Sequence, residues 1–396
     1  MLSVVTVTTL YPNPIQPAHG SFVATRLKEL LTSGEVCAEV IAPVPWMPPA
    51  FSHPSSGPLR LIPSIRSDGQ VIVHHPRYLV IPKIGMNLTP HTLYYALKTS
   101  LSGILASGRR VDLIDAHYFY PDGVAAVRLG RHFGIPVCVT ARGTDLNLIP
   151  EYAIPRRMIS DAALHADGLI TVCQALKDRL TELGPAPEKI VVLRNGVDLK
   201  LFQPVDRQQA RASLGCNRRT LGSVGLLIAR KGHHHVISAL PSLPDTDLLI
   251  VGDGPEKAAL HRLAQRIGVA DRVRFLGLVE QSQLKRVYSA MDGLVLASSR
   301  EGWANVLLEA MACGTPVVAS SVWGTPEVVT APQAGVLMSS LDSRGVVDGV
   351  GRLFANYPDR YQTRLYAERF SWDATTQGQL ALFKDILDRR QPNKAP

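Results

Sequence analysis

The sequence predicts an α/β protein of two domains, each built on an open parallel β-sheet with helices on both faces. Three observations lead to this prediction. The chain has 396 residues, and a single hydrophobic core rarely grows to that size. Short β-branched runs alternate with helical stretches along almost the whole chain, which is typical of parallel sheets. The alternation also restarts once, near residue 200.

The first half of the chain contains six expected strands with helices between them. The strands are 2–8, 36–42, 111–115, 137–140, 168–172 and 190–193, and the helices include 22–31, 123–133 and 174–183. The stretch 43–90 is rich in proline and lacks the alternation, so we interpret it as an irregular insertion or loop region. Residues 1–200 are expected to form an N-terminal, Rossmann-like domain.

The second half begins after a turn at Asn195-Gly-Val-Asp198 and a charged stretch at 199–215. Residues 201–370 are expected to form a second Rossmann-like domain, and 371–390 a long amphipathic helix. Each open sheet offers a crevice at the carboxyl ends of its strands, so two doubly wound sheets that face each other would share one cleft. The expected strands are 220–226, 247–251, 273–276, 293–297, 316–319 and 335–338.

Composition and charge narrow the class of protein. Hydrophobic residues make up 46% and charged residues 19%, as in globular proteins. The chain lacks a run of roughly 18 apolar residues and a signal-peptide start, so we expect a cytoplasmic protein. Its five cysteines are scattered, which argues against a disulfide framework or a zinc site. The net charge of +9 is spread along the chain, which favours attraction to nucleotides, phosphates or anionic lipid over nucleic acid.

The strongest chemical signal follows the fourth expected strand of the second domain and reads S-S-R-E-G-W-A-N-V-L-L-E-A-M-A-C-G-T-P over 298–316. Glu301 would lie in the loop at the strand's carboxyl end, and Gly302 would let the backbone approach a ligand. Amides at the start of the next helix would bind an anion, while Asn305 and Glu309 would share one helix face. The pattern predicts carboxylates at a sugar and a ribose, with amides at a diphosphate.

A second signal, V-G-L-L-I-A-R-K-G at 224–232, joins the first strand of that domain to its first helix. Gly225 would permit close backbone approach. Lys231 is a mobile cation suited to a diphosphate, whose negative charge rises as the sugar leaves.

Two weaker loops and two metal-like patterns are also present. The loop V-G-D-G-P-E contains Gly252 and Gly254, and the turn at 195–198 would face a donor or serve as a hinge. Histidines 233–235 are consecutive and would point in different directions. The D-x-D pattern at 245–247 precedes a strand, which puts Asp245 at the wrong end of the sheet for a ligand. We therefore expect no metal.

The order of these motifs, together with R-F-L-G at 274–277, resembles that of the retaining glycosyltransferases of family 4, which have the GT-B fold. The resemblance covers essentially the whole chain and is strongest from Asn195 to Glu327. The stretches A-H-Y-F-Y-P-D-G and R-G-T-D-L-N further resemble enzymes of bacterial surface-polysaccharide and teichuronic-acid synthesis. In such proteins the C-terminal helix crosses back to the first domain.

The resemblance implies a nucleoside-diphosphate sugar as co-substrate, with no resident cofactor. Glu301 and Glu309 would be the two glutamates of the family's E-x7-E motif, and Lys231 would contact the donor phosphates. The donor-binding residues expected on this basis are Gly225, Lys231, Gly252, Gly254, Arg274, Leu276, Glu301, Gly302, Trp303, Ala304, Asn305 and Glu309. The expected catalytic residues are Glu301, Lys231, Arg142 and Asp145.

The sequence departs from the family pattern at two places. Leu226 stands where the family often has an arginine after the V-G glycine. Arg142, in V-T-A-R-G-T-D, stands where the family commonly has a sugar-contacting histidine. Arg142 would then bind phosphate, and Asp145 would contact donor or acceptor.

The acceptor side is expected to include Gly20, His117 and Asp122. His117 follows a strand, and a purely structural role for it is equally open. We expect a saccharide or lipid-linked saccharide acceptor.

The segment 43–90 would carry the lipid contact. Apolar residues there, beside Arg77 and Lys83, suggest weak peripheral binding to the inner face of the membrane, although an ordinary loop cluster would explain them too. These apolar residues are Trp46, Met47, Phe51, Leu79, Val80, Ile81, Ile84 and Met86.

The resemblance implies that the expected hexosyl transfer retains the anomeric configuration. We expect same-face attack, because no side chain is an obvious covalent nucleophile. Two other classes of protein would require different sequence features. A nicotinamide-dependent oxidoreductase would need G-x-G-x-x-G after the first strand, and that fingerprint is absent. A non-catalytic nucleotide- or RNA-binding protein is suggested only by the charge.

Overall fold

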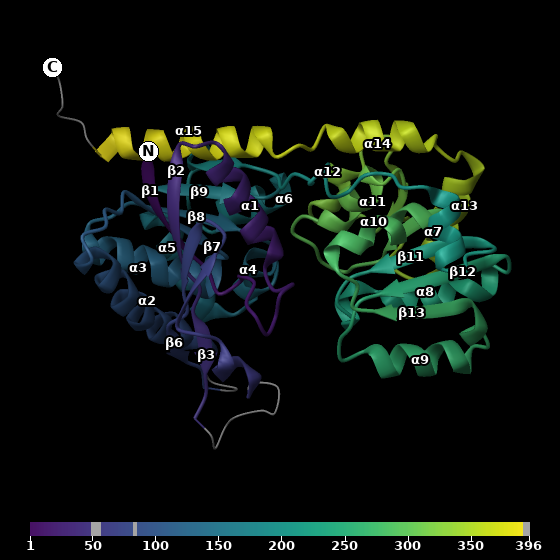
Figure 1. Cartoon of the computed structure of the whole chain (residues 1–396), viewed down its shortest axis with the longest axis horizontal. Coiled ribbons are helices and arrows are strands. Elements are labelled where there is room, and N and C mark those ends of the chain that lie inside the picture. Colours follow the sequence, from purple (N-terminus) through teal and green to yellow (C-terminus); the bar gives the residue numbers. More distant parts are fainter. Residues whose placement is uncertain (49–56, 82–84, 391–396) are drawn as a thin grey trace. The chain divides into compact units, whose positions relative to one another are not determined.

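The computed structural model of the chain describes residues 1–48, 57–81 and 85–390. The chain divides into two compact units (Figure 1). The first unit is Met1–Arg194 with Asp373–Pro396, and the second unit is Asn195–Trp372. Both are open α/β sheets covered by helices, so the predicted fold class, two Rossmann-like domains, is confirmed.

An eight-stranded sheet forms the centre of the first unit, in the order β10-β9-β8-β7-β1-β2-β5-β4. Every pair in it is parallel except β4 with β5. A separate parallel pair joins β3 to β6. The strands are β1 (Leu2–Val7), β2 (Val36–Ile41), β3 (Val44–Trp46), β4 (Ile65–Asp68), β5 (Val71–His74), β6 (Arg77–Leu79), β7 (Leu113–His117), β8 (Val137–Ala141), β9 (Gly168–Thr171) and β10 (Ile190–Val192).

Helices cover both faces of this sheet, as two neighbouring residues of β8 illustrate. Successive strand residues point to opposite faces. Val137 packs against Gly130 of α3, whereas Cys138 lies beside Ile386 of α15 near Gly168. The helices of the unit are α1 (Ser21–Thr32), α2 (Thr89–Ala106), α3 (Val124–Phe133), α4 (Thr144–Asn147), α5 (Ala153–His165), α6 (Gln174–Thr181) and α15 (Asp373–Arg390).

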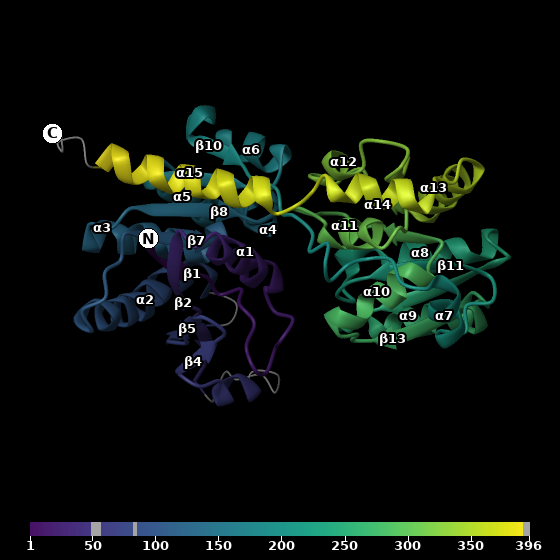
Figure 2. The ribbon, with the colours of Figure 1, turned by 45° about the horizontal axis from the view of Figure 1, so that its top comes forward.

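The C-terminal helix α15 belongs to the first unit although it follows the second unit in sequence (Figure 2). Leu380, Phe383 and Ile386 from its apolar face are buried with Val4 and Leu113 of the sheet. The helix therefore returns to the first unit, as the family resemblance implied.

The interpretation of 43–90 as an irregular region is wrong for most of its described part. Strand β5 pairs in parallel with β2, and β4 adds an antiparallel edge. Val71 and Val73 are buried in the core, because this β-branched run alternates between the core and a half-buried face. The density of proline around the strands concealed this short signal.

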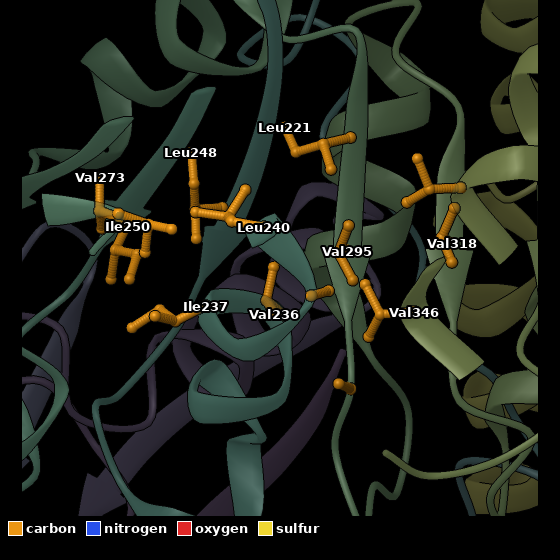
Figure 3. Close-up of a cluster of buried hydrophobic side chains, with 14 of the residues drawn as sticks. Leu221, Val236, Ile237, Leu240, Leu248, Ile250, Val273, Val295, Val318 and Val346 are labelled. Atoms are coloured by element: carbon orange, nitrogen blue, oxygen red, sulfur yellow. The ribbon is translucent and has the colours of Figure 1, made fainter. Parts of the chain in front are cut away.

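The second unit contains a six-stranded, wholly parallel sheet in the order β13-β12-β11-β14-β15-β16. Its apolar core, in which Val236 and Ile237 of α8 lie against Leu248 and Val295 of the sheet, is drawn in Figure 3. The elements are α7 (Arg207–Ser213), β11 (Arg219–Val224), α8 (His233–Ala239), β12 (Thr246–Val251), α9 (Lys257–Arg266), β13 (Val273–Gly277), α10 (Gln281–Ala290), β14 (Gly293–Leu296), α11 (Asn305–Ala312), β15 (Val317–Ala319), α12 (Thr325–Val328), β16 (Gly335–Leu337), α13 (Ser343–Ala355) and α14 (Arg360–Glu368).

Among the described residues, none of the helices has both the length and the apolar character that crossing a membrane requires.

Candidate active site

The carboxyl ends of β11 and β14 bring Lys231 and Glu301 together in the second unit. Lys231 ends a short 3-10 turn after β11, and Glu301 lies in the loop that follows β14. The Lys231 Nζ is 2.5 Å from Glu301 Oε1, and the side chains are 16% and 8% exposed. Two residues predicted independently from two motifs thus form one ion pair, at the edge of the sheet where ligands of such folds bind.

Three glycines predicted at the donor let neighbouring loops of this edge pack closely. All three have positive φ values, which L side chains rarely adopt: 147° at Gly225, 134° at Gly252 and 157° at Gly254. A Cβ atom at Gly252 would lie 1.9 Å from the Gly225 carbonyl oxygen. At Gly254 it would lie 2.5 Å from the Leu227 carbonyl oxygen. The close approach that these glycines permit is between two stretches of backbone, and contact with a ligand remains a prediction.

Glu309 lies on α11 and is held by Tyr288 of α10. The Tyr288 hydroxyl donates to Glu309 Oε2 over 2.7 Å. Burial raises the pKa of Glu309 to about 7, against the opposing effect of that hydrogen bond. The carboxyl group therefore titrates near neutral pH, and Tyr288 fixes its orientation.

The loop before α11 is anchored to the start of the second unit. Trp303 is 7% exposed, and its indole Nε1 donates to the Asn195 carbonyl over 3.0 Å. The Asn195 Nδ2 donates to Asn305 Oδ1 over 3.2 Å. Glu301, Gly302 and Ala304 are buried in the same loop. Trp303 and Asn305, both predicted to bind the donor, thus position the loop that carries Glu301.

Arg274, which was expected near a nucleotide base, hydrogen-bonds to a neighbouring loop. Its guanidinium donates to the Leu214 carbonyl and approaches Cys216 Sγ at 3.5 Å. Leu276 lies in the same strand and is partly buried. In this structure Arg274 fixes the loop that leads into β11.

The two metal-like patterns of the second unit lie at opposite ends of its parallel sheet, and His233 is two residues from Lys231. Asp247 is the second residue of β12, at the opposite end of that strand from Gly252. His233 is buried, its Nδ1 lies 2.8 Å from the Ser223 hydroxyl, and burial lowers its pKa to about 4. Within the described ranges, no cluster of three or more His, Cys, Asp or Glu residues could hold a metal ion.

In the first unit, Arg142 stands at the end of a buried chain of hydrogen bonds. It follows β8 directly and is 9% exposed. Its Nη2 donates to His117 Nδ1 over 2.6 Å, and His117 Nε2 lies 3.1 Å from Asp115 Oδ2. An arginine only donates hydrogen bonds, so His117 must accept at Nδ1 and carry its proton on Nε2.

The charge states of these hydrogen-bonded residues follow from their burial. Burial, and next to it the charge of Arg142, lowers the pKa of His117 to about 4, although Asp115 acts in the opposite direction. Burial opposes ionisation of Asp115, but His117, Arg26 and Arg142 hold the pKa of that carboxyl below its usual value. His117 is therefore a neutral relay between a carboxylate and a guanidinium at physiological pH.

The C-terminal helix supplies the last residue of this hydrogen-bond network. Gln379 of α15 donates from Nε2 to Asp115 Oδ2 over 3.0 Å, and its Oε1 accepts from Arg26 Nε over 2.8 Å. The sequence motifs pointed to neither Arg26 nor Gln379. The D-A-H spacing gave a signal, because residues two apart in a strand share a face, but Gln379 gave none, since it is 264 residues from Asp115.

Asp145, predicted to be catalytic, binds main chain in this structure. Its carboxylate accepts from the amides of Phe119 (2.7 Å), Arg142 (3.0 Å) and Gly143 (2.6 Å). Burial raises its pKa against these three hydrogen bonds. Asp145 thereby fixes the turn on which Arg142 stands, and direct contact with a substrate remains a prediction.

Two of the predicted acceptor-side residues fix the loop after β1. Asp122 accepts from the Thr9 amide (2.5 Å) and hydroxyl (2.9 Å), and burial raises its pKa to about 8. Gly20 has a φ of 65°, and a Cβ atom there would lie 2.2 Å from the Leu10 carbonyl. Both residues therefore shape the same loop.

The predicted lipid-facing segment is only partly described, since Phe51, Lys83 and Ile84 lie outside the described residues. Trp46 is 42% exposed. The other apolar residues proposed for it, Met47, Leu79, Val80, Ile81 and Met86, are partly buried. Arg77 donates to the carbonyls of His75 and Ile62, which leaves it a structural cation.

Two family models match the chain in succession. "Glycosyltransferase Family 4" matches residues 50–201, and "Glycosyl transferases group 1" matches residues 206–370. D-inositol 3-phosphate glycosyltransferase from Mycobacteroides abscessus is 34% identical over 331 residues, which are 76% of this chain and 74% of the relative. The enzyme of the same name from Mycobacterium marinum is 32% identical over 301 residues, which are 70% of this chain and only 64% of the relative.

Solved structures share the fold at low sequence identity. Sucrose-phosphate synthase from Thermosynechococcus elongatus has a TM-score of 0.81 at 21% identity and covers 98% of this chain and 100% of its own. HepE from Anabaena, solved in complex with UDP-glucose, has a TM-score of 0.72 at 19% identity, with 97% and 100% covered.

Proposed function

Because this chain belongs to the glycosyltransferases of group 1 and family 4, we propose that it transfers a hexosyl unit from a nucleoside-diphosphate sugar to an acceptor hydroxyl, with retention of anomeric configuration. The second unit would bind the donor and the first unit the acceptor. The observation that carries the proposal is the ion pair of Lys231 with Glu301 at the carboxyl edge of the second sheet.

This pair suits a change of partner when the donor binds. A diphosphate offers Lys231 more negative charge than one carboxylate, and that charge grows as the bond to the sugar breaks. Glu301, released from Lys231, would accept hydrogen bonds from the sugar's hydroxyl groups. The ammonium is already placed in a partly buried site, where its interaction with the leaving group is stronger than in water.

Glu309 would accept hydrogen bonds from the ribose hydroxyls. Its raised pKa means that part of the population is protonated at neutral pH in the free protein. A carboxylate accepts two hydroxyl donors better than a carboxyl group does, so donor binding would favour the ionised form.

The chemical step would be same-face attack, in which the departing phosphate helps to deprotonate the acceptor. In this scheme the positive charges and amides of the protein stabilise the negative charge of the leaving group. Activity is therefore expected without a metal ion. Arg142 would supply a further positive charge, either to the donor's diphosphate or to a phosphate on the acceptor.

The relatives and the sequence favour different acceptors. The relatives are named for D-inositol 3-phosphate, and the phosphate of such an acceptor is an anion that the guanidinium of Arg142 would bind well. The motifs of the first domain instead resemble those of surface-polysaccharide enzymes, which act on saccharide or lipid-linked acceptors. We favour the phosphorylated polyol, because it rests on identity over most of the chain.

The protein is proposed to act in the cytoplasm, with weak peripheral contact to the inner face of the membrane and no nucleic-acid partner.

A screen of nucleotide sugars by thermal melting tests the donor half of the proposal. We expect one or a few donors to raise the melting temperature of the wild type and not that of Lys231→Ala. A flat response to every nucleotide sugar would contradict it.

A further inference from the structure

A pocket of about 510 Å³ lies on the helical face of the first unit formed by α2, α3 and α5. Helix α3 packs against both α2 and α5, and Figures 1 and 2 show α2 and α3 side by side. Part of the lining is apolar and comes from Val124, Val127 and Met158. None of the residues proposed for sugar transfer lines this pocket.

Three arginines give the pocket its charge. Arg128 and Arg131 of α3 and Arg157 of α5 line it, and the one acidic residue of its lining is Asp161. Arg128 is fixed by a 2.7 Å hydrogen bond to His91 and by its position 4.5 Å from the centre of the Tyr94 ring. All three arginines are exposed. Such a pocket attracts an anion, and guanidinium groups bind phosphate oxygens well.

Arg131 and Arg157 make neither an ion pair nor a side-chain hydrogen bond among the described residues of the chain. The nearby carboxylate of Asp161 instead lies 3.3 Å from His165. The two guanidinium groups can therefore turn toward a ligand without breaking an internal contact.

Exposed apolar side chains surround these cations. Tyr95 lies one helical turn from His91 on α2 and is 62% exposed. Ile154, one turn before Arg157 on α5, is 48% exposed, and Leu88, just before α2, is 46% exposed. Residues three or four apart share a helix face, so apolar groups and arginines face the same side. Apolar and aromatic groups beside cations are typical of surfaces that lie in the headgroup region of a membrane.

We propose that this face of α2, α3 and α5 docks on an anionic membrane, with the arginine pocket holding the phosphate of one phospholipid headgroup. A free phosphate ion would satisfy the arginines but would leave Leu88, Tyr95 and Ile154 exposed to water. The proposal moves the membrane contact from the segment around Arg77, whose guanidinium is taken by two carbonyls. It does not depend on the proposed sugar transfer.

Co-sedimentation of the full chain with vesicles tests this surface. We expect binding to phosphatidylcholine vesicles only when phosphatidylglycerol is added, and weaker binding as salt increases. The double variant Arg131→Glu/Arg157→Glu should lower the partition coefficient at least about 25-fold, since each basic residue near such a surface contributes about a factor of five. The matched control, Lys28→Glu/Arg262→Glu, changes the net charge equally at exposed positions of other helices, α1 and α9, and should lose much less binding.

The apolar half of the surface needs its own variant. Ile154→Ser leaves the charge unchanged and should weaken vesicle binding several-fold, with the melting temperature unaltered because the side chain is exposed. Absence of vesicle binding at low salt, or equal binding by the double variant and its control, would overturn the proposal. A melting shift caused by inorganic phosphate and abolished in the double variant, without vesicle binding, would also overturn it, because the pocket would then serve a soluble anion.

Discussion

The two units hold their predicted functional cations in opposite ways. Lys231 in the second unit is paired directly with Glu301, one carboxylate on a neighbouring loop. Arg142 in the first unit donates to a neutral histidine, which is held in turn by Asp115 and, through Gln379, by the C-terminal helix. A direct ion pair can exchange its partner for a diphosphate, whereas a buried relay keeps one guanidinium in one place.

The largest loss of activity is expected when Lys231, the cation that can exchange its partner, is replaced. Lys231→Ala should lower kcat about a hundredfold to a thousandfold, because it removes a charge that acts on the leaving group. Lys384→Ala is the matched control, since it breaks a 2.6 Å lysine–glutamate pair on the surface of the first unit and should leave kcat unchanged. Steady-state kinetics with saturating donor measures both. Equal kcat values for the two variants would remove Lys231 from the reaction.

A smaller loss is expected when the relay to Arg142 is cut. His117→Ala should lower kcat/KM about tenfold to a hundredfold, as for the loss of a hydrogen bond to a charged group of about 1.5–3 kcal/mol. His117→Asn restores an acceptor at the position of Nδ1 and should recover much of the activity. A purely structural histidine predicts the same rate for both folded variants.

The relay also predicts that the pH profile of kcat/KM shows no titration of His117 near neutral pH. The pKa of His117 is lowered to about 4, so the ring stays neutral and accepts from Arg142 at every pH above about 5. Below pH 4 it would become charged and release Arg142. A change in kcat/KM between pH 6 and pH 7 that disappears in His117→Asn would contradict this account.

Glu309 is expected to have a more modest effect, confined to the donor. Glu309→Ala should weaken nucleotide-sugar binding about tenfold or more, because ribose hydroxyls lose a charged acceptor. The ionised form is the better acceptor, and the pKa is about 7, so wild-type affinity should increase from pH 6 to pH 8. Calorimetry at both pH values measures this, and an unchanged affinity in the folded variant would exclude Glu309 from the site.

The same pKa gives a stability prediction with a definite sign. The folded pKa of Glu309, about 7, lies above the ordinary value of 4.5, so the folded state binds more protons than the unfolded state between these values. Stability must then fall as pH rises through this window. Glu309→Gln should melt at a higher temperature than the wild type at pH 8, and the difference should vanish near pH 4.

No effect is expected from chelation. Transfer measured in excess EDTA should proceed at the rate of the untreated protein, because Lys231 and main-chain amides are proposed to hold the diphosphate. Complete loss that magnesium or manganese restores would instead point to a metal at the donor.

The sequence predicted the second unit better than the first, for a physical reason. Lys231 and Glu301 each follow an apolar strand, and the carboxyl ends of parallel strands share one edge, so local motifs sufficed to place both. Arg142 was identified as unusual, but the residues that hold it, directly or through one another, come from two other elements, β7 and α15. Hydrogen-bond partners of this kind depend on packing over hundreds of residues, which no local pattern contains.

Several side chains that were predicted to bind ligands make hydrogen bonds that anchor loops and turns in this structure. Asp145 binds three amides, Trp303 binds the Asn195 carbonyl, and Arg274 binds a neighbouring loop. Each is polar and lies in a loop or at a strand end, where ligand contact and loop anchoring give the same sequence signal. A buried polar group must find a partner in either case, so the residue type alone could not separate the two roles.

The most direct test of the central claim is transfer itself, followed by NMR with a panel of nucleotide sugars and D-inositol 3-phosphate or a saccharide as acceptor. The account predicts that at least one donor yields a product with the anomeric configuration of the donor, and that Lys231→Ala and Glu301→Gln abolish its formation while Lys384→Ala does not. Transfer that persists in both active-site variants, or a product of inverted configuration, would contradict it.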